Sequence, residues 1–87
     1  MALALVTGAS SGIGLQLAGQ LAERGYDIVG VGASSRVTEL GSIINSVEVI
    51  PVQADLTTPE GIEHVWAAVE ATGRPLALVL NMFDIAT

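Results

Sequence analysis

The segment with the most evident chemical use is a glycine-rich turn near the N-terminus. Residues 7–14 are Thr-Gly-Ala-Ser-Ser-Gly-Ile-Gly and complete an apolar run that starts at residue 3. The spacing places Gly8 at a sharp turn, Gly12 where a ligand would approach the backbone most closely, and Gly14 at the start of a helix. Backbone N–H groups of such a turn lie at the positive end of the helix and bind a pyrophosphate without any lysine. The predicted dinucleotide contacts are those of the whole turn: Gly8, Ser10, Ser11, Gly12, Ile13 and Gly14.

A purely structural turn is the alternative, in which Gly14 only allows the helix to pack closely on the sheet. Three spaced glycines are weak support for a binding site when they are taken alone. Here an expected strand precedes them and an expected helix follows, which is the context that dinucleotide binding requires. We therefore favour cofactor binding.

Ribose selectivity depends on the residues after the second apolar run, 27–32. In NAD-binding folds an acidic residue about 20 positions beyond the last glycine of the turn holds the ribose 2′-hydroxyl. Residues 32–36 contain no acid, and Ser34, Ser35 and Arg36 instead offer two hydroxyls and a guanidinium. These groups suit charge-assisted hydrogen bonds to a 2′-phosphate, so we expect NADP, with NAD as the less favoured cofactor. The alternative is that the serines only shape the loop and that Arg36 is a solvated surface residue.

Four apolar, β-rich runs must position these groups: residues 3–7, 27–32, 47–52 and 76–80. The first and the last are nearly unbroken, which is typical of strands buried on both faces of a parallel sheet. Pro51 lies in the third run and lacks the N–H that a strand ladder needs, so this strand is expected at a sheet edge. Strands that alternate with helical segments imply right-handed βαβ units, and the predicted fold class is α/β.

The first helix is expected to follow the glycine-rich turn. Ile13, Leu17 and Leu21 recur there at helical spacing, flanked by Ala18 and Ala22, and predict this helix. The pattern stops at Arg24-Gly25, where a glycine suits a helix C-terminus.

The second long helix is expected to begin at Thr57, which as the N-cap would share a capping box with Glu60, and to end near Gly73. Residues 36–44 fit only a short, poor helix interrupted by Gly41. The predicted apolar face of the long helix, with the tryptophan ring in the core, comprises Ile62, Val65, Trp66 and Val69.

Residues 7–14 resemble the Thr-Gly-x-x-x-Gly-Ile-Gly cofactor fingerprint of the short-chain dehydrogenase/reductase family. Asp55-Leu56 resembles the Asp-Leu of that family's adenine pocket, and residues 78–81 resemble the strand that leads into its Asn-Ala-Gly motif. The resemblance adds Asp55, Leu56 and Asn81 to the predicted cofactor contacts. For Asp55 and Asn81 a structural role in a turn or cap is an alternative of equal weight.

The same resemblance implies a fold. Residues 1–87 are expected to form a single, incomplete NAD(P)-binding domain, a partial Rossmann fold. Its parallel sheet is expected to have about four strands in the order 3-2-1-4 with flanking helices.

The residues that this family uses for catalysis are not in the sequence. They lie downstream of the asparagine motif, whereas here Met82-Phe83 replaces the family's Ala-Gly and the sequence ends at Thr87. The sequence has no lysine, and its only tyrosine, Tyr26, is expected to open a strand. The full-length family transfers a hydride between a nicotinamide cofactor and a carbonyl or alcohol carbon. We therefore expect the cofactor-binding half of an oxidoreductase, inactive alone; the alternative is a non-enzymatic nucleotide-binding or assembly module.

Composition argues against several other functions. Nine acids and three scattered arginines give a net charge of −6, which disfavours binding to nucleic acid. One histidine and no cysteine are too few ligands for a metal site. No apolar stretch is long enough for a membrane span, and a cytoplasmic location is expected. Residues 76–80 would leave an apolar strand edge without blunting lysines or prolines, so self-association or partner binding is expected there.

Overall fold

The computed structural model describes residues 2–9 and 12–80. Along the chain these residues form β1 (Leu3–Thr7), α1 (Gly12–Glu23), β2 (Asp27–Gly32), the 3-10 helix η1 (Ser35–Glu39), α2 (Leu40–Ile43), β3 (Val49–Gln53), α3 (Pro59–Ala71) and β4 (Leu76–Leu80). The strands at 3–7, 27–32 and 76–80 coincide with the expected runs, whereas β3 begins two residues later than expected.

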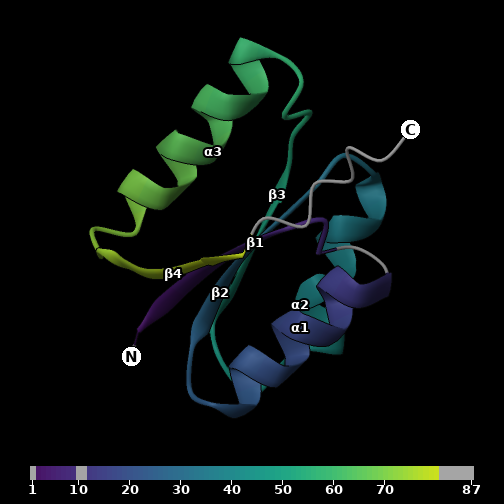
Figure 1. The fold of residues 1–87 in the computed structure, drawn as a ribbon, viewed down its shortest axis with the longest axis vertical. Coiled ribbons are helices and arrows are strands. Elements are labelled where there is room, and N and C mark those ends of the chain that lie inside the picture. The colour runs from purple at the N-terminus through teal and green to yellow at the C-terminus, as the bar shows by residue number, and fades with distance from the viewer. Residues whose placement is uncertain (1, 10–11, 81–87) are drawn as a thin grey trace.

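The described strands form one four-stranded sheet in the order β3-β2-β1-β4, and every neighbouring pair is parallel. This confirms the α/β class and the strand order expected from the sequence. Helices α1 and α2 lie on one face of the sheet and α3 lies on the other (Figure 1). The strand with Pro51 is an edge strand, as its missing N–H requires.

Two apolar layers form the core, one on each face of the sheet. Under α1 and α2 the buried side chains include Ala4, Val6, Ile28, Val37 and Leu40. Under α3 they include Leu3, Val29, Val31, Val52, Val65 and Val69. Side chains of β1 and β2 serve both layers, and this double burial explains why the two strands carry so few polar side chains.

The buried face of α1 is centred on the small residues that flank the predicted leucines, with Leu21 packed at its margin. Gly14, Ala18 and Ala22 are buried, whereas Leu17 and Leu21 are half-buried and Ile13 is 65% exposed. Small side chains allow the helix axis to approach the sheet closely, and that approach decides which face turns inward. The helix end is as expected: Gly25 has a φ of +91°, and the N–H groups of Gly25 and Tyr26 return to the last turn at Ala22 and Leu21.

The start of α3 lies one residue later than predicted. Thr58 is the N-cap, and its hydroxyl oxygen accepts a hydrogen bond from the Gly61 N–H at 3.0 Å. The predicted capping box of Thr57 with Glu60 is wrong: the cap is Thr58, and the Thr57 hydroxyl donates to the Asp55 carboxylate at 2.6 Å. The hydrogen bond from Gly61 to Thr58 therefore marks the helix start.

The predicted core position of Trp66 is also wrong. Its side chain is 59% exposed, and Ile62 on the same face is 46% exposed, whereas Val65 and Val69 are buried. The described sheet ends at β4, so the outer half of this apolar face has no strand beneath it in the described residues. None of the helices that these residues form has the length and hydrophobicity needed to span a bilayer.

Candidate functional site

The carboxyl ends of all described strands lie at one edge of the sheet. In register, Thr7 pairs with Val31, Val31 pairs with Val52, and Val6 pairs with Leu80. The segments that follow β1, β2 and β3 are therefore neighbours, and they contain the predicted turn, the Ser34–Arg36 loop and Asp55. The order in which strands are added to the sheet reverses at β1: β2 and β3 lie on one side of it and β4 lies on the other. Ligands of open α/β sheets bind at such a switch point.

The glycine-rich turn is anchored to both the sheet and α1. Gly8 and Gly12 have φ angles of +66° and +60°, which side chains other than glycine rarely adopt. The buried Ala9 donates its N–H to the carbonyl of Val31 at 3.0 Å, which ties the turn to β2. A Cβ at Gly14 would overlap the carbonyl oxygen of Gly8, so glycine is required there by helix packing alone.

The described part of the same turn is exposed on its outer side at Gly12. A Cβ built at Gly12 would meet no atom within 4 Å, and both Gly12 and Ile13 are exposed at the first turn of α1. The backbone at this helix N-terminus is therefore accessible to an anion. Ser10 and Ser11, also predicted contacts, lie outside the described residues.

The loop after β2 is ordered by its own side chains. The Ser34 hydroxyl oxygen caps η1 by accepting the Arg36 N–H at 3.1 Å, and the Ser35 carbonyl accepts from the Thr38 hydroxyl at 2.7 Å. Ser34, Ser35 and Arg36 are all exposed. Within the described residues the Arg36 guanidinium has no ion pair, so it is available to a ligand phosphate.

Asp55 has a clear structural role. Its carboxylate accepts hydrogen bonds from the Thr57 hydroxyl at 2.6 Å and from the Thr57 N–H at 2.9 Å. These two bonds hold the pKa of the Asp55 carboxyl below its ordinary value, the hydroxyl contributing most. The structural alternative for Asp55 is thus present, and its adenine contact stays a prediction. Leu56 is half-buried against the α3 layer, and Asn81 lies outside the described residues.

One residue at this edge was missed from the sequence. The Gln53 side-chain amide donates to the carbonyl of Ala33 at 3.3 Å, beside a backbone bond from Ala54 N–H to the Gly32 carbonyl at 3.0 Å. Both bonds join the end of β3 to the loop that carries Ser34 and Arg36. No local pattern reveals them, because the partners lie 20 residues apart in the sequence.

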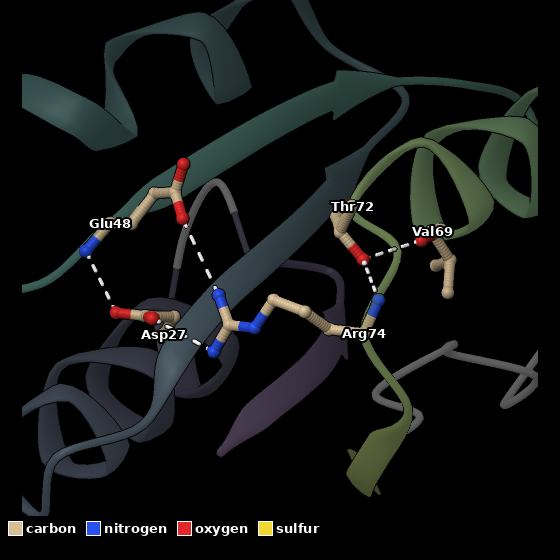
Figure 2. Close-up of polar contacts among 5 residues, drawn as sticks. All are labelled: Asp27, Glu48, Val69, Thr72 and Arg74. Atoms are coloured by element: carbon tan, nitrogen blue, oxygen red, sulfur yellow. Dashed lines mark hydrogen bonds and ion pairs between the residues drawn. The ribbon is translucent and has the colours of Figure 1, made fainter. Parts of the chain in front are cut away.

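A second missed cluster lies at the opposite, amino end of the strands. Arg74 contacts the Asp27 carboxylate at 2.9 Å and Glu48 at 3.4 Å, while Asp27 also accepts the Glu48 N–H at 2.9 Å (Figure 2). Thr72 at the end of α3 accepts the Arg74 N–H and so orients this residue. The cluster clamps the starts of β2, β3 and β4 and belongs to the scaffold rather than to the candidate site.

A family model for short chain dehydrogenases matches residues 2–82 of this sequence. The chain belongs to the short chain dehydrogenase family. Its carboxyl-edge turn and strand order are those that the resemblance implied.

Relatives within the family use different cofactors. The NAD-dependent glycerol dehydrogenase of Listeria innocua is 31% identical and covers 97% of this chain. The bovine dehydrogenase/reductase SDR family member 11 is 33% identical over the same share of this chain. A solved structure of L-sorbose reductase from Gluconobacter frateurii, complexed with NADPH and L-sorbose, is 32% identical, covers 99% of this chain and has a TM-score of 0.88. The chain spans only 33 to 35% of the length of these proteins.

Proposed function

We propose that this chain is the NADP-binding half of a short chain dehydrogenase-like oxidoreductase. The observation that carries the proposal is the pairing of two features at one sheet edge: a glycine-rich turn whose Gly12 is exposed at the start of α1, and an acid-free loop whose Arg36 forms no ion pair within the described residues. NADPH in the sorbose reductase supports NADP, whereas the Listeria relative supports NAD as the alternative.

The described residues fit such a cofactor. Backbone N–H groups near Gly12 at the start of α1 would hold the pyrophosphate, since no atom among the described residues lies within 4 Å of a Cβ built there. The Arg36 guanidinium and the Ser34 hydroxyl hydrogen, which donates to no described residue, would hold the ribose 2′-phosphate. When bound, NADP would supply hydride chemistry at its nicotinamide; the chain's own residues bind and orient it.

Hydride transfer by the 87-residue chain alone is not part of this proposal. The Tyr-x-x-x-Lys pair of the family needs a lysine, and this sequence has none. Asp55 is bonded within its own turn and is no substitute for that pair.

Titration of the chain with NADP and with NAD tests the proposal directly. Calorimetry should show one site, with NADP bound more tightly than NAD. Tighter binding of NAD would overturn the cofactor choice, and absence of binding to both would overturn the function.

A second candidate role is association through β4, and a groove favours it. A groove of about 280 Å³ lies between α3 and the β4 edge, with Trp66, Ile62 and Val79 among its lining residues. The pairing of β4 with β1 contains an extra residue, Ala77, between Leu76 and Leu78. This irregularity changes which side chains share a face of the sheet. Leu76 and Val79 both line the groove, whereas Leu78 packs on the other face. An apolar edge and groove of this kind favour a second copy or a partner.

A further inference from the structure

A side-chain hydrogen bond from outside its own segment helps to hold the ribose loop, residues 33–38. Hydrogen bonds of Ser34 and Thr38 fix the local turn. Both partners of each bond lie within the loop, so these bonds do not fix the position of the loop relative to the sheet. The buried side chain of Val37 and the backbone bond from Ala54 to Gly32 anchor this unit, and in the described part of the chain Gln53, at the end of the neighbouring strand, adds a side-chain bond to Ala33. The position of Ala33, and with it the position of Ser34 and Arg36, therefore depends in part on a residue outside the loop.

The register of the sheet explains how Gln53 reaches the loop. Gln53 pairs with Gly32, which has no side chain to stand between the amide and the Ala33 carbonyl. A carbonyl oxygen only accepts hydrogen bonds, so the amide nitrogen must face it. The next residue after Ala33 is Ser34, the cap of η1, and Arg36 follows in the first turn of that helix.

We propose that Gln53 is a positioning residue for 2′-phosphate selectivity, acting through the Ala33 carbonyl on Ser34 and Arg36. This inference rests on the proposed NADP function and deepens it. Loss of the amide donor should let the loop shift at Ala33, which weakens contacts to a 2′-phosphate and leaves contacts to the pyrophosphate turn unchanged. The affinity for NADP should therefore fall while the affinity for NAD stays near that of the parent.

The test compares the NADP and NAD dissociation constants of the parent with those of Gln53→Ala and Gln53→Glu. Each variant should lower the NADP preference about 3- to 10-fold, the range of one ordinary hydrogen bond. Glutamate keeps the size of the side chain but replaces its donor with an acceptor, so retained preference in Gln53→Glu would overturn the inference. Gln20→Ala, at an exposed glutamine on α1, is the matched control and should keep the parental preference.

A double-mutant cycle separates positioning from a general structural effect. In the Arg36→Ala background, Gln53→Ala should change the NADP preference by less than about 2-fold, because the group that it positions is already gone. An undiminished effect in that background would overturn the inference. Thermal melts followed by circular dichroism should be the same for all Gln53 variants, since this side chain is exposed.

The proposed function and this inference fail in different ways. If Arg36→Ala removes the NADP preference and Gln53→Ala keeps it, the inference is wrong and the cofactor site stands. If the parent has no NADP preference, the proposed function fails and this inference fails with it.

Discussion

Arg36 combines exposure, absence of an ion pair among the described residues, and a capped backbone that holds its position. If it holds the 2′-phosphate, Arg36→Ala should weaken NADP binding about 10- to 100-fold relative to NAD, as expected for a hydrogen bond to a charged group. Arg24→Ala, at an exposed arginine just beyond α1, is the control and should change neither affinity. An unchanged NADP-to-NAD ratio in Arg36→Ala would make Arg36 a surface residue.

Asp27 makes stability sensitive to acid. Burial acts to raise its pKa, but the Glu48 N–H and the Arg74 guanidinium outweigh burial and hold the pKa of Asp27 below its ordinary value. A carboxyl whose pKa is lower in the folded state stabilises the fold above the pKa of the unfolded chain, and this stabilisation is lost as the pH falls through the folded value. The contribution of Asp27 should thus be complete at neutral pH, begin to decrease at about pH 4, the pKa of a free aspartate, and be lost below the lower pKa of the folded state.

Replacement of Asp27 by Asn should show this directly. At pH 7 the variant should lose about 1–3 kcal/mol of unfolding free energy, because Arg74 keeps a charge without its closest partner. Glu48→Gln is the matched control: Glu48 is 64% exposed and 3.4 Å from Arg74, so its loss should cost less than about 1 kcal/mol. Urea unfolding at pH 7 and pH 3 measures the unfolding free energy of both variants. The difference in unfolding free energy between the parent and Asp27→Asn should be smaller at pH 3. An equal difference at the two pH values would contradict the stabilising role of the Asp27 carboxylate.

At the scale of elements, the close approach of α3 to the segment before it depends on Gly61. A Cβ there would overlap the Asp55 carbonyl, and the same carbonyl accepts bonds from Thr58. Gly61→Ala should therefore destabilise the chain by about 1–3 kcal/mol through forced displacement of α3. Gly19→Ala is the control inside α1, since its Cβ would meet nothing within 4 Å, and it should stabilise by about 0.5–1 kcal/mol. Equal stability of Gly61→Ala and the parent would show that α3 can shift freely.

The sequence predicted the elements whose cause is local. Strands β1, β2 and β4 followed from apolar runs, and the glycine-rich turn followed from spacing alone. The prediction was incomplete where small residues set the contact: Gly14 and the flanking Ala18 and Ala22 are buried, whereas the predicted Ile13 is exposed.

Contacts that the pattern of residue types does not reveal explain the remaining differences. Thr58 caps α3 while Thr57 bonds to Asp55, and Trp66 is exposed because no described strand lies beneath it. In the site, the Ser34–Arg36 loop was found from its composition. The Gln53 contact was not, since it depends on the register of β2 and β3.

At the scale of the whole molecule, the apolar groove beside β4 is expected to drive association. The parent should sediment as a dimer or larger species at tens of micromolar. Val79→Lys places a charge on a groove residue that is 54% exposed and should raise the dissociation constant at least about 10-fold. Ile43→Lys, at an isoleucine of α2 that is 58% exposed, tests the other face and should have no effect. A monomeric parent, or equal dissociation by both variants, would refute association through β4.

The strand order also has a consequence for synthesis on the ribosome. β1 can pair with β2 once both have been synthesised. The other edge of β1 stays unpaired until β4 has been made, because Leu3 pairs with Leu76 near the far end of the described chain. At about 5–20 residues per second, the central strand of the sheet stays half-paired for several seconds while β3 and α3 are made. Pairing between positions so distant in sequence is intrinsically slow. A nascent chain of this topology is therefore a natural client for chaperones that bind exposed strands during translation.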